Sequence, residues 1–155
     1  LPHGARPPLA GADADAVARA LDACDVAHLA DRPACDLSGG ERARALLARA
    51  LAVEAVLLLA DEPVAALDPA HQLAVMATLA AEAAKGRAVL VVTHDVGLAL
   101  RACSRLLLLR EGRLVADLRA QDEATPGALE HTFGVAFASA EVDGMRLIAP
   151  SKALV

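Results

Sequence analysis

Apolar residues recur at helical spacing near the start of the chain. The pattern begins after Asp13 and consists of Val17, Leu21 and Cys24, with Asp and Arg residues between them. Residues 1–11 are rich in Pro and Gly, which is typical of a surface loop. The pattern therefore predicts a loop that leads into a helix near Asp13.

Two further helices carry start signals in their sequence. Ser38 and Glu41 form an S-x-x-E capping box, which predicts a short amphipathic helix from Ser38 onward. Asp68 followed by Pro69 is an N-cap with Pro in the first turn, and Gly86 is expected to end that helix. Its apolar periodicity is continued by Leu73, Met76, Leu79, Ala80 and Ala83.

Short apolar runs alternate with these helices. Residues 56–60 and 88–93 are each too short for a helix, and both end at polar residues, as buried parallel strands do. A helix over about 95–103 and a strand over 106–109 follow. The order of strands and helices predicts an α/β fold with a layered core.

The last third of the chain predicts two hairpins. Residues 106–109 and 113–116 flank Glu111-Gly112, a dipeptide that suits a tight turn. Further on, a second hairpin is expected over 135–148, with its turn at Asp143-Gly144. A short helix that starts at Thr125-Pro126 and ends at Gly134 is predicted between the two hairpins.

Composition narrows the function classes. A chain of 155 residues with 56% hydrophobic content suffices for one core. Its net charge of −5 and 1% aromatic content argue against nucleic-acid binding, which needs a basic surface and stacking side chains. No run of 18 or more apolar residues lacks charge, so no direct membrane insertion is expected. The three cysteines lack C-x-x-C spacing, and reduced thiols in a cytoplasmic protein are predicted.

Two adjacent carboxylates end the first predicted strand. Asp61 and Glu62 would lie at the sheet edge where open α/β folds bind ligands. At such an edge Asp61 suits a Mg²⁺ ligand and Glu62 suits a base that activates water. The alternative is that Asp61-Glu62-Pro63 is simply a polar exit from the strand.

The string Leu37-Ser38-Gly39-Gly40-Glu41 is a second candidate site. A capping box alone explains Ser38 and Glu41. It does not require Gly39 and Gly40, which leave the backbone N–H groups of a helix N-terminus open to an anion such as phosphate.

Asp68 and His94 are further candidates for site residues because of their positions in the chain. Asp68 is by default an N-cap, and a lone histidine after a strand is by default structural. His94 would nevertheless lie level with Glu62 if the two predicted strands are parallel neighbours, and it could then donate to a phosphate oxygen. Four other histidines show no metal-ligand spacing and are interpreted as structural, namely His3, His28, His71 and His131.

In this order the motifs resemble those of the ATP-binding cassette (ABC) transporter ATPases. Residues 37–41 resemble the signature segment, residues 61–63 the acidic strand end, residues 66–68 the D-loop, and His94 the switch histidine. The resemblance implies ATP and Mg²⁺ as cofactors, and Glu62 and His94 as catalytic residues. It also implies a head-to-tail homodimer in which Ser38, Gly39, Gly40 and Glu41 close over the partner's ATP, with Asp68 as a further cofactor-binding residue.

The resemblance also implies how the chain is divided. Residues 1–52 would be part of the helical subdomain, 53–120 the second half of a P-loop ATPase core, and 121–155 a C-terminal extension. No G-x-x-x-x-G-K-[ST] loop is present, so an N-terminally truncated cassette is expected, and this chain alone is expected not to hydrolyse ATP.

The subtype and the partners follow from the same resemblance. The stretch Leu67-Asp68-Pro69-Ala70-His71-Gln72-Leu73, the opening residues 1–4 and the segment 132–135 look like importers of iron-siderophore, haem or cobalamin. Such a subunit works with transmembrane permease subunits on the cytoplasmic face of the cell membrane. The alternatives are a soluble ABC-type ATPase not linked to transport, and a non-catalytic cassette fragment that acts as an interaction module.

Overall fold

The chain forms two compact units that divide between Val92 and Thr93. The computed structural model describes residues 11–65, 67–120, 122–123, 125–142 and 145–153. The predicted surface loop over residues 1–11 falls almost entirely outside these ranges, as do the importer-like opening residues 1–4 and the Asp143-Gly144 turn. The domain boundaries predicted at 52/53 and 120/121 stay predictions.

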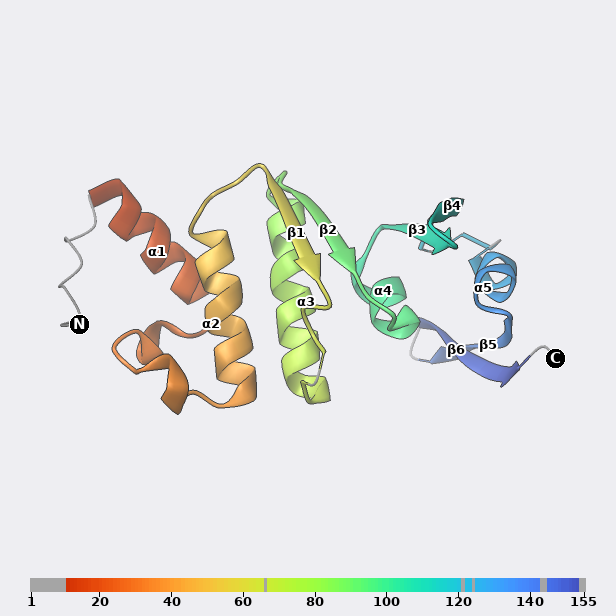
Figure 1. Cartoon of the computed structure of the whole chain (residues 1–155), viewed down its shortest axis with the longest axis horizontal. Helices are drawn as coiled ribbons and strands as arrows, with labels where there is room; N and C mark the ends of the chain where they lie inside the picture. The colour runs from red at the N-terminus through yellow and green to blue at the C-terminus, as the bar shows by residue number, and fades with distance from the viewer. Residues whose placement is uncertain (1–10, 66, 121, 124, 143–144, 154–155) are drawn as a thin grey trace. The chain divides into compact units, whose positions relative to one another are not determined.

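The first unit consists of three helices and two paired strands (Figure 1). Two short 3-10 turns, η1 and η2, connect the first two helices. The elements in chain order are α1 (Gly11–Ala23), η1 (Ala27–Leu29), η2 (Ala34–Asp36), α2 (Gly39–Leu51), β1 (Leu57–Asp61), α3 (Pro69–Ala84) and β2 (Ala88–Val92).

Small side chains form the buried stripe of α1. Ala16 and Ala20 are buried, and Cys24 just beyond the helix is 3% exposed, whereas Val17 and Leu21 are only half-buried. Small residues let α1 and α2 pack closely, and α2 contributes buried residues of its own near its C-terminal end. Burial raises the pKa of the Cys24 thiol to about 11, with a smaller contribution from the negative charge of Glu82.

The strands β1 and β2 pair in parallel, as the sequence predicted. Their register runs from Leu57 opposite Ala88 to Asp61 opposite Val92. The expectation that both strands are buried is wrong, because exposure alternates along them: Leu58 is buried while Leu59 is 66% exposed. In a pleated strand, successive side chains point to opposite faces, and α3 packs on the pair. The described part of this sheet thus has one covered and one apolar exposed face.

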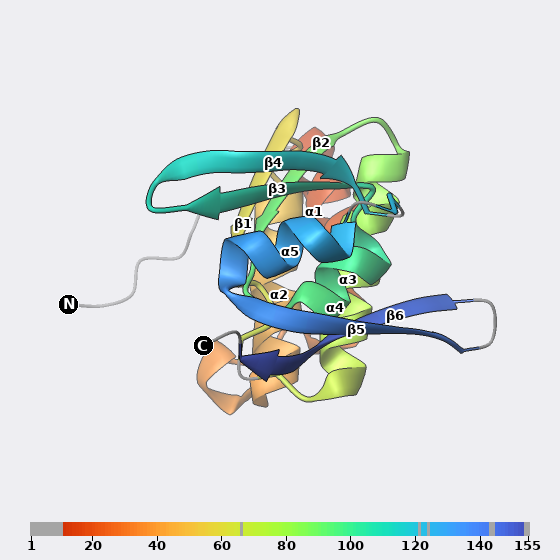
Figure 2. The same ribbon diagram turned by 90° about the vertical axis from the view of Figure 1, so that its right-hand side faces the viewer.

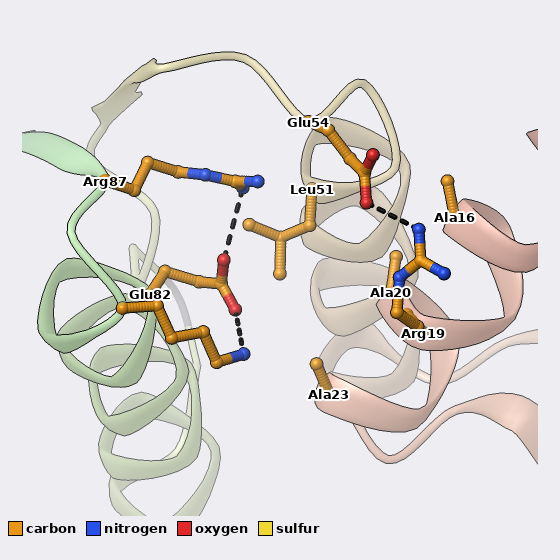
Figure 3. A pocket seen from close by; sticks show the side chains of 9 residues that line it. Ala16, Arg19, Ala20, Ala23, Leu51, Glu54, Glu82 and Arg87 are labelled. Carbon is orange, nitrogen blue, oxygen red and sulfur yellow. Dashed lines mark hydrogen bonds and ion pairs between the residues drawn. The ribbon is translucent and has the colours of Figure 1, made fainter.

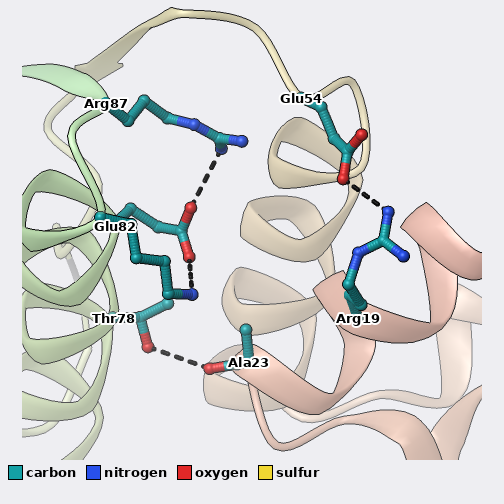
Figure 4. Close-up of polar contacts among 7 residues, drawn as sticks. Arg19, Ala23, Glu54, Thr78, Glu82 and Arg87 are labelled. Carbon is teal, nitrogen blue, oxygen red and sulfur yellow. Dashed lines mark hydrogen bonds and ion pairs between the residues drawn. The ribbon is translucent and has the colours of Figure 1, made fainter.

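A charged cluster is buried near the end of α3. Glu82 is 7% exposed, and its carboxylate binds Lys85 Nζ at 2.6 Å and Arg87 Nη1 at 3.3 Å (Figure 4). Arg87 is itself largely buried, whereas the Lys85 side chain is 64% exposed. Helical periodicity did not predict a buried carboxylate at this position, and the two cations are what make its burial tolerable.

The second unit places a helix between two antiparallel hairpins (Figure 2). The helix α5 packs on both β3 and β5, and α4 packs on β6. The elements are α4 (Val96–Ala102), β3 (Arg105–Arg110), β4 (Arg113–Arg119), α5 (Thr125–Phe133), β5 (Val135–Val142) and β6 (Met145–Ala153). Their shared core contains Leu100, Leu106, Leu108, Ala120, Leu129 and Ile148.

The first hairpin turns where the sequence predicted. Glu111 and Gly112 have positive φ values of 50° and 73° between the paired residues Arg110 and Arg113. Two successive positive φ angles match the twist of a two-residue hairpin. Gly134 also has a positive φ, of 67°, directly after α5, as a helix-ending glycine does.

None of the helices in the described ranges is both long and apolar enough to span a lipid bilayer.

Removal of the Glu82 carboxylate is expected to destabilise the chain. Glu82→Ala would leave Arg87 largely buried without its partner, at a cost of about 3 to 5 kcal/mol of unfolding free energy. Lys85→Ala is the matched control, because its exposed ammonium is expected to contribute less than about 1 kcal/mol. Urea unfolding monitored by circular dichroism measures both. Equal effects of the two substitutions would contradict the inferred role of burial.

Candidate functional site

The N-terminal turn of α2 is closed by a reciprocal capping box. The Glu41 backbone N–H donates to Ser38 Oγ at 3.3 Å, and the Ser38 backbone N–H donates to Glu41 Oε2 at 2.8 Å. The backbone hydrogen bond from Ser38 is the main cause that lowers the pKa of Glu41. The turn is thereby held in one conformation, with the positive end of the helix dipole at Gly39 and Gly40.

The two glycines of this turn have different surroundings. Among the described residues, a Cβ placed on Gly39 would meet no atom within 4 Å beyond its own turn, so open space lies beside its backbone. A Cβ placed on Gly40 would lie 2.3 Å from Cδ2 of His71, so a side chain at position 40 would require the His71 ring to shift. Gly39 thus has the open surroundings expected of an anion-binding glycine, whereas the absence of a side chain at Gly40 has an explanation within the protein.

Asp68 begins α3 as predicted and also binds the ring of His71. Its Oδ1 accepts from the His71 backbone N–H at 3.0 Å, and its Oδ2 lies 2.5 Å from His71 Nδ1. The backbone hydrogen bond is the first cause that lowers the pKa of Asp68, followed by the bond to the ring. The remainder of the predicted D-loop includes Ala66, which lies outside the described residues.

Asp61 and Glu62 lie at the carboxyl end of β1, as predicted. Asp61 is exposed and pairs with Val92, and the Glu62 backbone N–H donates to Val92 O at 2.9 Å. Glu62 has a φ of 46°, in the left-handed region that non-glycine residues seldom adopt. Its carbonyl then accepts from the Ala65 backbone N–H at 3.1 Å. The chain thus turns sharply away from the sheet at Glu62, and such backbone strain is concentrated at functional sites.

The segment around His94 belongs to the second unit. Thr93 Oγ1 accepts from the Asp95 backbone N–H at 3.1 Å, and Asp95 Oδ1 accepts from the Leu98 backbone N–H at 2.9 Å. Asp95 is therefore the N-cap of α4, and His94 is an exposed residue between two structurally fixed neighbours. Its predicted role opposite Glu62 stays a prediction, because the two residues lie in different units.

The donor chemistry of Asp61 fits a magnesium site of the phosphate-dependent type. Mg²⁺ is commonly held by one or two carboxylates together with phosphate oxygens and water. An exposed carboxylate at the end of a parallel strand meets that requirement. Among the described residues, no group of three or more His, Cys, Asp or Glu side chains could hold a metal ion by itself.

A separate cavity of about 190 Å³ lies between α1 and the C-terminal ends of α2 and α3 (Figure 3). Arg19 and Glu54 pair across one side at 2.7 Å, and the Glu82 cluster lines the other. The charged side chains already satisfy one another here. None of the predicted site residues lines this cavity.

Comparison with known proteins supports the interpretation of the motifs. The sequence profile described as "ABC transporter" matches residues 5–65. Hemin import ATP-binding protein HmuV from Rhodococcus jostii is 42% identical over 150 residues, which cover 96% of this chain and 51% of that protein. The protein of the same name from Streptomyces coelicolor is 52% identical over 116 residues, or 72% of this chain and 41% of its own length. The chain belongs to the ABC transporter ATPase family.

Solved structures agree with this assignment. A metal-chelate type ABC transporter in an inward-facing conformation matches 97% of this chain and 61% of its own, with a TM-score of 0.79 and 29% identity. A dimeric bacterial ABC transporter cassette matches 76% of this chain and 52% of its own, with a TM-score of 0.62 and 29% identity. The α/β fold predicted for the cassette is confirmed. The chain spans about half the length of the curated relatives it matches.

The contacts of His71 agree with its interpretation as a structural residue, but the sequence did not predict its partners. His71 was interpreted as structural because it lacks metal-ligand spacing. The D-x-x-H spacing from Asp68 to His71 could have indicated the bond between their side chains, since residues three apart share a helix face. No sequence signal indicated the contact between His71 and Gly40.

The capping box of α2 is expected to make the stability of the cassette depend on pH. Because the pKa of Glu41 is lower in the folded than in the unfolded chain, its stabilising effect is full above pH about 4.3 and is lost as the pH falls through the folded value. Glu41→Gln is therefore expected to be less stable than the parent at pH 7, with a difference that shrinks towards pH 3.

Thermal unfolding between pH 3 and 7 measures this difference. Ser38→Ala is the companion variant, because it removes the hydroxyl cap and is expected to cost about 1 kcal/mol at pH 7. If the difference in unfolding midpoint between Glu41→Gln and the parent stayed constant from pH 3 to 7, the Glu41 charge would not contribute to the capping box as inferred.

Proposed function

We propose that these residues belong to the ATP-hydrolysing subunit of an importer for haem or a related metal chelate. The observation that carries the proposal is the open N-terminal turn of α2, where Gly39 leaves the helix N-terminus accessible and Ser38 and Glu41 hold it in shape. Backbone N–H groups at a helix N-terminus bind phosphate oxygens through direct donation and the helix dipole. In the proposed dimer this turn closes over ATP held by a second copy of the subunit.

Two carboxylates supply the proposed hydrolytic chemistry. Asp61 would hold Mg²⁺, which neutralises charge on the phosphates when it is bound. Glu62 would orient the attacking water and accept its proton, because the left-handed turn at this residue directs the chain away from the sheet edge. The hydrogen bond from the Glu62 N–H to Val92 O fixes that turn against β2.

His94 and Asp68 complete the proposed site. His94 follows β2 and would donate a hydrogen bond to the terminal phosphate of ATP, which would report that the phosphate is present. Asp68 would be a further cofactor-binding residue, beside the N-terminal turn of α2 on the same subunit. Both roles are carried over from the family resemblance.

The names of the relatives support the proposed substrate. Several proteins named hemin import ATP-binding protein match most of this chain at 42% to 52% identity. A metal-chelate type transporter matches its fold. We therefore propose hemin, or otherwise a siderophore or cobalamin, as the imported compound, with permease subunits as membrane partners and the cytoplasmic face of the membrane as the location.

Replacement of the proposed base is expected to trap an ATP-bound dimer. In the complete subunit that contains these residues, Glu62→Gln keeps the size of the side chain but removes the proton acceptor. Turnover is expected to fall about 100-fold or more while ATP still closes the dimer. Phosphate release and size-exclusion chromatography with Mg-ATP measure the two properties.

Glu111→Gln is the matched control for this experiment. Glu111 is also a glutamate with a positive φ, but it lies in the hairpin turn between β3 and β4. It is expected to retain the parental turnover. Unaltered turnover in Glu62→Gln would refute the assignment of Glu62 as the base.

The substrate class is tested with the reconstituted transporter. The complete subunit and its permease, placed in lipid vesicles, are expected to hydrolyse ATP faster when hemin is presented by the cognate binding protein, and to accumulate hemin. Cobalamin and a ferric siderophore serve as parallel substrates. Stimulation by one of these two but not by hemin would change the substrate assignment and leave the importer assignment in place.

A further inference from the structure

We propose that His71 is a positioning residue that links the phosphate-binding turn of α2 to Asp68, so that the N-terminal ends of α2 and α3 move together when the dimer closes over ATP. This proposal rests on the proposed function, because the turn has to engage ATP. Three observations within the first unit carry it.

The first observation is that Asp68 fixes the ring of His71. One carboxylate oxygen accepts from the His71 backbone N–H, and the other lies 2.5 Å from Nδ1 of the ring. The same carboxylate therefore caps α3 and restricts the rotamer of the third residue of that helix. The His71 side chain is 32% exposed, so protein surrounds most of it.

The second observation is the contact of the ring with Gly40. An added Cβ at Gly40 would lie 2.3 Å from Cδ2, 2.5 Å from Nε2 and 2.6 Å from Cγ of His71. The ring therefore lies in the space that a side chain at position 40 would occupy. Because Asp68 holds the opposite side of the ring, the ring cannot swing aside without losing that bond.

The third observation is the contrast with Gly39. Both glycines lie in the first turn of α2, but a Cβ on Gly39 would meet no described residue within 4 Å outside that turn. One glycine therefore allows a ligand to approach, and the other allows the turn to pack inside the protein. Gly39 faces open space that a phosphate can enter, whereas Gly40 transmits the position of the turn to His71.

These contacts form a continuous path from the turn to Asp68. A displacement of the α2 N-terminus towards α3 would press Gly40 on the ring, and the ring on the carboxylate. Catalysis in a closed site is sensitive to such placement, since a shift of about 1 Å can cost about 100-fold in rate. The expected role of His71 is to keep the phosphate donors of the turn at a constant distance from Asp68.

A double-mutant cycle on the complete subunit tests the contact. Gly40→Ala is expected to lower the unfolding midpoint by about 5 °C, because the new methyl group displaces the ring. His71→Ala removes the ring, so that the added methyl group is tolerated and most of the loss in Gly40→Ala is recovered in the double variant. Gly39→Ala is the matched control, and its midpoint is expected to change little with or without His71. Additive effects of Gly40→Ala and His71→Ala would overturn the contact.

The positioning role needs a second readout that a purely structural role would leave unchanged. In the Glu62→Gln background, His71→Ala is expected to raise the ATP concentration for half-maximal dimer formation about 10-fold. His71→Gln, whose amide can still donate to Asp68, is expected to stay within about twofold of the parent. A structural role alone would lower the amount of folded protein without a shift of this midpoint.

The possible results separate this proposal from the proposed function. If His71→Ala changes the unfolding midpoint but leaves the ATP midpoint unaltered, the positioning role is overturned. If the Glu62→Gln parent forms no ATP-dependent dimer, the proposed function fails, and the role of His71 in dimer closure fails with it. The unfolding cycle reports on the Gly40 contact in either case.

Discussion

The parallel pairing of β1 with β2 is the constraint on which the acidic part of the site depends. It places Asp61 opposite Val92 and lets the next residue, Glu62, donate its backbone N–H to Val92 O at 2.9 Å. With its N–H bound to the neighbouring strand and its carbonyl bound to Ala65, Glu62 has to turn out of the sheet. A shift of this register by one residue would turn the Asp61 side chain to the other face of the sheet and break the bond from Glu62 to Val92.

Helix N-termini supply the phosphate-binding part of the candidate site. The helices α2, α3 and α4 each begin at a side chain that accepts a backbone N–H bond, from Ser38, Asp68 and Asp95 respectively. Such caps satisfy donors that a helix leaves open, and they fix where each helix starts. In α2 and α3 the same caps also orient groups assigned to ligand binding. Local helix stability and the geometry of the candidate site therefore depend on the same hydrogen bonds.

What could be predicted from the sequence follows from how local each feature is. The caps at Ser38 and Asp68 and the turn at Glu111-Gly112 depend on residues within a few positions of one another, and they were predicted correctly. The burial of Glu82 and the contact between His71 and Gly40 join residues from different elements, or reverse the usual preference of a residue type, and no periodicity shows them. Which residues of β1 face outward, such as Leu59, could not be predicted, because an apolar run looks the same whether one or both faces of its strand are covered.

The backbone at Glu62 has a consequence for the stability of variants at this position. A non-glycine residue with a φ of 46° carries a local strain of roughly 1 to 3 kcal/mol, which glycine avoids and asparagine reduces. The same left-handed conformation recurs at Asp25, Glu54 and Glu111, so strain of this size is tolerated at several acidic residues of the chain. Replacement of Glu62 by glycine or asparagine would therefore relieve backbone strain while it removes the carboxylate, and a gain in stability would accompany the loss of the acid.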